Sequence, residues 1–129
     1  MKKILFVCIE NSNRSQMAQA FAIIHGKNKV EAYSAGSRPS GVVNPKAVSA
    51  MKAIGYDLTT HASKSINDYR DEKFEYVITM GCGDECPFIA AKHHKNWEIP
   101  DPRNFDEAWF NKIRDIIEQK VIALIKELS

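Results

Sequence analysis

A cysteine and an arginine separated by five residues form the most chemically informative motif of the chain. The motif and the residue after it are, in order, Cys8, Ile9, Glu10, Asn11, Ser12, Asn13, Arg14 and Ser15. A short apolar run precedes Cys8 and helical spacing begins at about Ser15, so the motif connects a strand to a helix. Backbone N–H groups of such a turn can surround a tetrahedral anion, and the N-terminus of the helix adds a positive dipole end. The motif therefore predicts thiolate chemistry on a phosphate-like oxyanion.

The polar side chains of this loop have distinct expected roles. The planar guanidinium of Arg14 can bond to two oxygens of the anion. The positive field of the loop favours the thiolate of Cys8, and Ser15 is placed to donate its hydroxyl to that sulfur. Asn11 can bridge the loop and fix its shape. Glu10 is an anion inside an anion-binding loop, so we expect its side chain to point outward and to disfavour highly charged substrates or peptide phosphates.

Two further cysteines, Cys82 and Cys86, lie among glycine and turn residues. With Cys8 they make three, a number that indicates catalysis, redox chemistry or metal binding in a cytosolic chain rather than structural disulfides. Two other interpretations stay open, namely buried structural thiols and a zinc site completed by His93 and His94. Zinc is the weaker of these, because adjacent histidines rarely face one metal and the spacing matches no common zinc pattern.

Apolar periodicity predicts alternating strands and helices along the chain. Strands are expected at 4–7, 30–34, 76–80 and 97–99, helices at about 15–25, 45–54 and 105–128, and loops at 37–43, 59–67 and 81–95. The helical residues expected to be buried are Met17, Ala18, Phe21, Ala22, Ile24, Val48, Met51, Ile54, Trp109, Ile113, Ile116, Ile117, Val121, Leu124, Ile125 and Leu128. The order implies βαβ units. We therefore predict a single domain, residues 1–129, of the α/β class: an open parallel sheet of about four strands with helices on both faces.

The chemically important residues follow the ends of different expected strands. Cys8 follows the first strand, Cys82 the third and Asp101 the fourth. Ligands of open parallel sheets bind at the carboxyl ends of the strands, so these residues are expected at one edge. A carboxylic acid near the departing oxygen of a substrate can protonate it, which makes Asp101 a candidate general acid. The alternative is an ordinary turn aspartate before Pro102.

Composition limits the classes of partner. The chain has 129 residues, 44% of them hydrophobic, and 18 basic against 16 acidic residues give a net charge of +2. This near balance favours neither nucleic acid nor membrane binding. No apolar run approaches the roughly 18 residues that a membrane span needs. The first seven residues begin like a signal peptide, but Glu10 and Asn11 interrupt the apolar stretch, so we expect a strand there and a cytoplasmic protein.

These residues resemble a known family. Cys8-x5-Arg14-Ser15 near the N-terminus, with Asp101-Pro102 far downstream, is similar to the low-molecular-weight protein tyrosine phosphatase superfamily. Within it, the residues at 11–18 resemble the arsenate reductase branch that draws electrons from thioredoxin. Further similar pieces are residues 33–36, residues 44–47, His61-x-Ser63 and Trp97-x3-Asp101-Pro102. The resemblance covers nearly the whole chain.

The resemblance implies a relay of thiols. In that branch Cys8 would attack arsenate, Cys82 would attack Cys8 and release arsenite, and Cys86 would attack Cys82 and carry the disulfide outward. The implied catalytic residues are Cys8, Arg14, Cys82, Cys86 and Asp101, in a monomer without a bound cofactor. The electron donor would be thioredoxin. Because the Cys82-x3-Cys86 spacing is shorter than in the best-known members, the order of the relay stays open, and glutathione with glutaredoxin is an alternative donor.

One group of positions departs from the pattern of the branch. Some members bind potassium beside the loop through an Asn, a Glu, a Ser and an Asp. Here Asn11 and Ser34 match, whereas Gln19 and Lys64 replace the two acids. The ammonium of Lys64 can supply the charge of the metal and bond to Asn11. We therefore expect no metal, with Asn11, Ser34 and Lys64 supporting the loop.

Two other functions remain open. A protein tyrosine phosphatase would hydrolyse phosphomonoesters through a phosphocysteine and would need aromatic side chains beside the loop, for which Trp97, Tyr69 and Phe88 are the candidates. A thiol-based metal or arsenite sensor could use the same three cysteines. The anion-binding loop argues against the sensor, because recognition of a soft cation does not need it. Residual phosphatase activity is expected of an arsenate reductase, since arsenate and phosphate share shape and charge.

Overall fold

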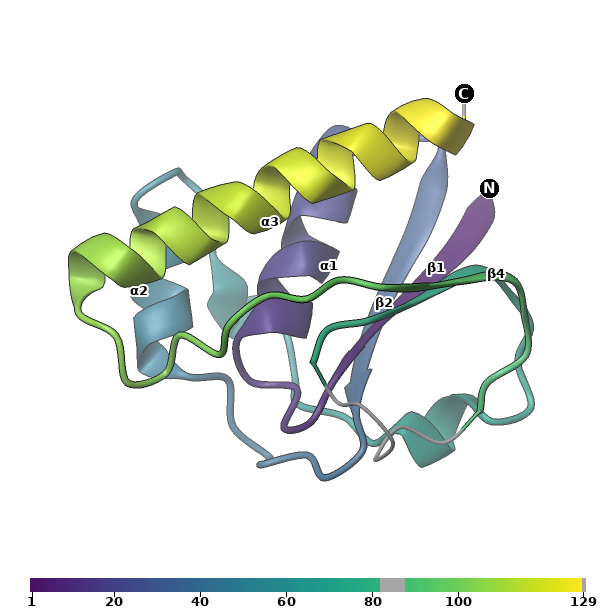
Figure 1. Cartoon of the computed structure of the whole chain (residues 1–129), viewed down its shortest axis with the longest axis horizontal. Helices are drawn as coiled ribbons and strands as arrows, with labels where there is room; N and C mark the ends of the chain where they lie inside the picture. Colours follow the sequence, from purple (N-terminus) through teal and green to yellow (C-terminus); the bar gives the residue numbers. More distant parts are fainter. Residues whose placement is uncertain (82–87, 129) are drawn as a thin grey trace.

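A four-stranded, all-parallel sheet forms the centre of the molecule (Figure 1). The computed structural model describes residues 1–81 and 88–128, so Cys82 and Cys86 lie outside the described residues. The strands are β1 (Lys2–Cys8), β2 (Val30–Gly36), β3 (Phe74–Thr79) and β4 (Ala91–Asn96), in the spatial order β2-β1-β3-β4. The α-helices are α1 (Arg14–His25), α2 (Pro45–Lys52) and α3 (Glu107–Leu128), and two 3-10 helices span Leu58–Thr60 and Ile66–Tyr69. The predicted α/β class and parallel sheet are confirmed.

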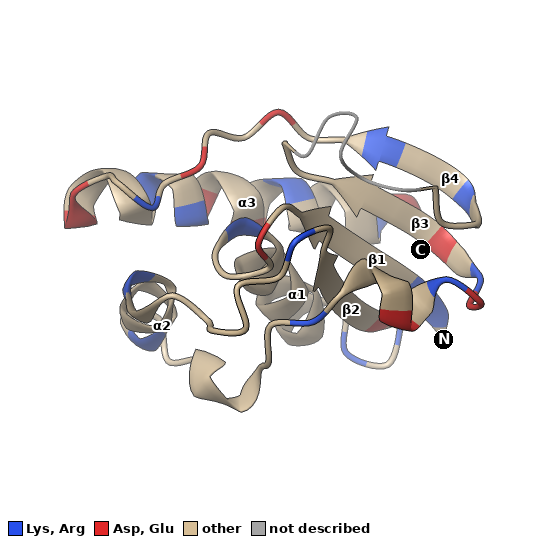
Figure 2. Cartoon of the chain, turned by 90° about the horizontal axis from the view of Figure 1, so that it is seen from below, with Lys and Arg blue, Asp and Glu red and all other residues tan. Residues whose placement is uncertain are grey.

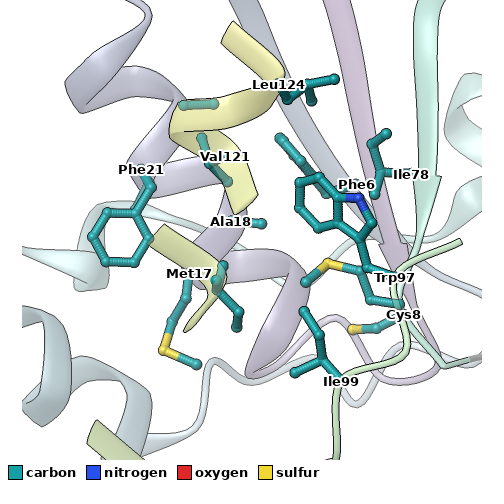
Figure 3. Close-up of a cluster of buried hydrophobic side chains, with 14 of the residues drawn as sticks. Phe6, Cys8, Met17, Ala18, Phe21, Ile78, Trp97, Ile99, Val121 and Leu124 are labelled. Atoms are coloured by element: carbon teal, nitrogen blue, oxygen red, sulfur yellow. The ribbon is translucent and has the colours of Figure 1, made fainter. Parts of the chain in front are cut away.

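The strand that leads to Cys8 is buried on both faces. Its side chains alternate between two apolar clusters, as the twofold repeat of a strand requires. Ile4, Phe6 and Cys8 belong to the larger cluster, whereas Leu5 and Val7 belong to the smaller one. Figure 3 shows Cys8 at the end of the larger cluster, which also contains side chains of α1 and α3. The nucleophile candidate is therefore fixed to the rigid centre of the sheet.

The three α-helices all contribute to the larger cluster. α1 contacts β1, β2 and α3, and α3 is the long helix that lies across this layer in Figure 1. The smaller cluster is covered by the 3-10 helix Ile66–Tyr69 together with Ile89. The helices expected on both faces are thus α-helices on one face and a short 3-10 helix on the other. Residues 1–81 and 88–128 contain no helix that is both long and apolar enough to cross a membrane.

The fourth strand lies elsewhere than the sequence predicts. β4 occupies Ala91–Asn96, of which all but Asn96 fall in the expected loop at 81–95, and the expected strand at 97–99 is wrong. β4 is an edge strand with mostly exposed polar residues, and its lysines appear as blue segments in Figure 2. It therefore lacks the apolar run by which buried strands are recognised. Trp97 and Ile99 are buried, but their backbone leaves the sheet after the bond from Trp97 N to Thr79 O.

Four residues expected in the helical core are exposed instead: Ile24, Ile54, Trp109 and Ile116. Ile54 lies beyond the end of α2 at Lys52, in the turn that Gly55 completes with a φ of 89°. Trp109 lies in the first turn of α3, where the Lys112 ammonium stands 4.3 Å from the centre of its ring. Periodicity identified the apolar faces of these helices, but it did not show which residues of each face lie beyond the packed core.

The register of β1 and β2 fixes the start of the loop that follows Cys8. Cys8 pairs with Gly36, the last residue of β2. A Cβ atom on Gly36 would lie 2.5 Å from Ile9 O and 2.9 Å from Asn11 N. Only glycine lets the backbone of the loop lie this close to the end of β2.

We expect Gly36→Ala to displace Ile9 and Asn11, to lower the free energy of unfolding by about 1–3 kcal/mol and to abolish orthophosphate binding. Urea denaturation and calorimetric titration with orthophosphate measure the two effects. Gly41→Ala is the matched control, because its Cβ would meet no atom within 4 Å and only its φ of 81° opposes alanine. If Gly36→Ala lost no more stability and no more orthophosphate affinity than Gly41→Ala, the close approach of the loop to Gly36 would be contradicted.

Candidate active site

The loop between β1 and α1 is held from outside by backbone bonds. Its carbonyl oxygens accept from the chain that follows β2: Ile9 O from Arg38 N at 2.8 Å, Glu10 O from Ser40 N at 3.0 Å and Ser12 O from Asn44 N at 3.0 Å. Asn13 is the N-cap of α1 and its side chain makes no capping bond. With the carbonyls directed outward, the loop and the first turn of α1 present N–H groups to an anion.

A pocket of about 390 Å³ lies inside this loop. The described residues that line it are Cys8, Ile9, Glu10, Ser12, Asn13, Arg14, Arg38, Asp101 and Arg103. The fold thus brings Asp101 to the loop from 93 residues beyond Cys8. The strand expected at 97–99, from whose end this position was predicted, is absent, and Asp101 lies in the segment that follows β4. Three guanidinium groups against two carboxylates leave this lining with a net positive charge that suits an anion.

The sulfur of Cys8 has a defined hydrogen-bond partner. Cys8 is buried, and its Sγ lies 2.8 Å from Ser15 Oγ. Asn11 Nδ2 donates to the same Ser15 Oγ at 2.7 Å. Because an amide NH₂ can only donate, Ser15 Oγ accepts from Asn11, and its own hydrogen can be donated to the sulfur. A nucleophilic sulfur at this position can accept that hydrogen bond.

Asn11 occupies the turn of the loop in a left-handed conformation, with a φ of 51°. Its Oδ1 accepts from Lys64 N at 2.8 Å and from Gln16 Nε2 at 3.0 Å. These bonds use both lone pairs of the oxygen. Lys64 therefore supports Asn11 through its backbone N–H rather than through the ammonium that the sequence suggested.

The four positions that match a potassium site in the family do not fit a cation here. Gln19 Oε1 accepts from Ser34 Oγ at 2.6 Å, and Gln19 Nε2 donates to Ala32 O at 3.1 Å. Gln19, Ser34 and Lys64 line one cavity, so an ammonium-bearing residue stands where the family places an anionic ligand. Gln19 Oε1 and Ser34 Oγ are hydrogen-bonded to each other, and the positive charge of Lys64 in the same cavity disfavours a metal ion.

Gln16, which is buried, and His61, which is half-buried, form an extension of the site that the sequence did not reveal. Gln16 Nε2 lies 3.0 Å from Asn11 O, Asn11 Oδ1 and Ala62 O, so its two hydrogens are shared among three acceptors. Gln16 Oε1 accepts from His61 Nδ1 at 2.9 Å. His61 Nε2 then accepts from Tyr56 OH at 2.7 Å. Both imidazole nitrogens are satisfied in the neutral form. Burial, helped by the nearby Lys64 ammonium, lowers the pKa of His61 below its usual 6.5.

Arg14 is buried and directed by two distant contacts. Its Nη1 donates to Ile99 O at 2.7 Å, so the segment after β4 holds the guanidinium. A Cβ atom on Gly81 would lie 2.4 Å from the same Nη1.

Trp97, one of the aromatic candidates, packs in the core beside Phe6, at 5.9 Å between ring centroids.

The remaining aromatic and histidine candidates do not meet at the pocket. Tyr69 is buried in the smaller cluster, and Phe88 packs against His94. Neither lines the pocket, so neither supplies a wall for a phosphotyrosine ring in this structure. His93 stacks on Tyr76, whereas His94 Nε2 lies 2.8 Å from Ile89 O. As neighbours on β4 they point to opposite faces, so they cannot both bind one zinc ion.

Comparison with known proteins places these features in a family. Residues 3–129 match the model of the low molecular weight phosphotyrosine protein phosphatase family. The glutaredoxin arsenate reductase of Synechocystis sp. is 33% identical over 132 residues, covering 100% of both chains. An arsenate reductase solved in its phosphate binding state has a TM-score of 0.90 at 31% identity, with 100% of both chains covered. The thioredoxin-dependent arsenate reductase of Corynebacterium glutamicum has a TM-score of 0.83 at 31% identity, over 99% of this chain and 62% of that chain.

The lowered pKa of His61 gives stability a pH dependence of known sign. As pH falls below about 6.5, the unfolded chain binds a proton at His61 before the folded chain does, so the free energy of unfolding decreases by up to about 1.4 kcal/mol per pH unit. The decrease ends at the pKa of the folded state. Urea denaturation between about pH 5 and about pH 8 measures it. We expect His61→Gln to lose this component and the exposed-site variant His25→Gln to keep it, whereas an equal slope in His61→Gln would assign the decrease to other groups.

Proposed function

We propose that this chain, which belongs to the low molecular weight phosphotyrosine protein phosphatase family, reduces arsenate to arsenite. The observation that carries the proposal is the pocket itself, where a buried Cys8 bonded to Ser15 lies beside Arg14 and Asp101. The second and third cysteines distinguish reduction from ester hydrolysis, because hydrolysis needs only one thiol. The arsenate reductases that resemble this chain over its whole length support the same choice.

The first step is a displacement at arsenic. The Cys8 thiolate attacks the bound arsenate while Arg14 and the loop N–H groups hold its oxygens. Asp101 gives its proton to the departing oxygen, which leaves as water. A Cys8–arsenic(V) bond forms as the arsenic–oxygen bond breaks, and arsenic has not yet received electrons from the thiols.

The reduction itself requires a second thiol. Cys82 attacks Cys8 Sγ, a Cys8–Cys82 disulfide forms, and the electron pair of the sulfur–arsenic bond remains on arsenic, which leaves as arsenite. Cys86 then attacks Cys82 and frees Cys8. Thioredoxin is the proposed donor that reduces the Cys82–Cys86 disulfide, with glutaredoxin as the alternative, and each donor is named for one of the related reductases. We propose the cytoplasm as the setting, where thiols are kept reduced, and a monomer as the acting unit.

The relay is tested by arsenate-dependent NADPH oxidation with thioredoxin and its reductase. Cys8→Ser, Cys82→Ser and Cys86→Ser should each abolish steady-state turnover, since each removes one sulfur of the relay. Phosphate in place of arsenate is the control and should give no oxidation. Wild-type turnover in Cys82→Ser and Cys86→Ser would refute the relay and favour the phosphatase alternative, whereas turnover in Cys8→Ser would refute the nucleophile.

The role of Asp101 as the acid makes a separate prediction. Asp101→Asn keeps an oxygen that can accept from Arg103 N, the bond that Asp101 Oδ1 makes at 3.1 Å, but it has no proton to give at that position. We expect kcat for arsenate to fall about 100-fold, with a much smaller change in the Kd of orthophosphate measured by calorimetry. A kcat of Asp101→Asn near that of wild type would contradict the role of Asp101 as the acid and favour its interpretation as an ordinary turn aspartate.

A further inference from the structure

An ion pair spans the rim of the anion pocket. Glu10 Oε2 lies 2.5 Å from Arg103 Nη1, and Arg103 Nε lies 3.5 Å from Asp101 Oδ2. The Arg103 side chain is 54% exposed and those of Glu10 and Asp101 are 37% exposed, so the cluster lies at the mouth of the pocket rather than at its floor. All three residues line the pocket. We call the Glu10–Arg103 pair the rim bridge.

Both ends of the rim bridge are fixed to the fold. Glu10 O accepts from Ser40 N and from Ser63 Oγ, each at 3.0 Å, which holds the backbone of the loop. Arg103 O accepts from Lys46 Nζ at 2.8 Å, and Arg103 N donates to Asp101 Oδ1. The bridge thus joins the loop after β1 to the segment after β4. These backbone contacts place the two side chains within reach of each other.

The chemistry of the pocket directs the leaving group towards the rim bridge. In an in-line displacement the departing oxygen lies opposite the attacking sulfur. Cys8 is 3% exposed at the floor, and Asp101 lies at the rim. The departing oxygen of a free oxyanion carries at most a hydrogen atom. In a phosphomonoester the same oxygen carries an organic group, which would need the space of the rim bridge.

We infer that the rim bridge is a specificity-determining element that admits a free tetrahedral oxyanion and obstructs the organic group of a phosphomonoester. The inference rests on the proposed function, in which Cys8 attacks a bound oxyanion. The pair has an electrostatic role as well, because Arg103 compensates the charge of Glu10 beside a bound dianion. An ester that displaced Arg103 would leave the Glu10 carboxylate uncompensated next to its own phosphate.

Breaking the rim bridge from either side tests the inference. In both Glu10→Ala and Arg103→Ala we expect kcat/KM for p-nitrophenyl phosphate, relative to that for arsenate, to rise about tenfold. The Kd of orthophosphate should move in opposite directions by about two- to fivefold, lower in Glu10→Ala and higher in Arg103→Ala. Arg38→Ala is the matched control: it removes an arginine from the same lining, leaves both members of the bridge in place and should not raise the ratio.

The outcomes separate this inference from the proposed function. An unchanged ester-to-arsenate ratio in both Glu10→Ala and Arg103→Ala would overturn the inference, and so would an equal rise in Arg38→Ala. If the wild-type protein does not reduce arsenate, kcat/KM for p-nitrophenyl phosphate is compared instead with the affinity for orthophosphate. A rise of this kcat/KM relative to the affinity in both Glu10→Ala and Arg103→Ala then supports the rim bridge, although the reductase assignment has failed.

Discussion

The hydrogen bonds of the Asn11 side chain are the constraint on which the site depends. A left-handed backbone costs a non-glycine residue about 1–2 kcal/mol, and here the φ of 51° is held by bonds to Ser15, Gln16 and the backbone of Lys64. The conformation turns the loop so that its carbonyls face the chain after β2. The same amide donates to Ser15 Oγ, which lies 2.8 Å from Cys8 Sγ. One side chain therefore connects the shape of the anion site to the hydrogen-bond partner of the nucleophile.

The order of the strands makes this local arrangement useful. β1 lies between β2 and β3, so the loop after Cys8 is flanked by the segments that leave its neighbours. β2 supplies Gly36, and the chain after it supplies the backbone donors of Arg38 and Ser40. The segment after β4 returns across the sheet end and brings Ile99 O to Arg14 and Asp101 to the rim. A site with a buried floor and a charged rim results from a parallel sheet whose carboxyl ends meet.

Charge and neutrality are divided between two sides of the loop. On the pocket side, arginines and carboxylates face the position of the anion. On the inner side, the network from Asn11 through Gln16 and His61 to Tyr56 satisfies its polar groups with a neutral imidazole. A partly buried network without net charge avoids the desolvation cost of ions in the protein interior. The loop is thus neutral on its inner side and charged where substrate enters.

The sequence alone determined what depends on local spacing. The oxyanion loop from Cys8 to Ser15, the first three strands and the three α-helices follow from motifs and periodicity, because neighbouring residues carry those signals. Asp101 was singled out by its resemblance to the family pattern, not by periodicity. The tertiary structure alone decided contacts between distant residues. β4 was missed because an edge strand needs no apolar run, and Gln16, His61 and Arg103 because their partners lie 45 to 93 residues away. Lys64 supports Asn11 with a backbone N–H, a group that every residue except proline has and that no side-chain pattern can reveal.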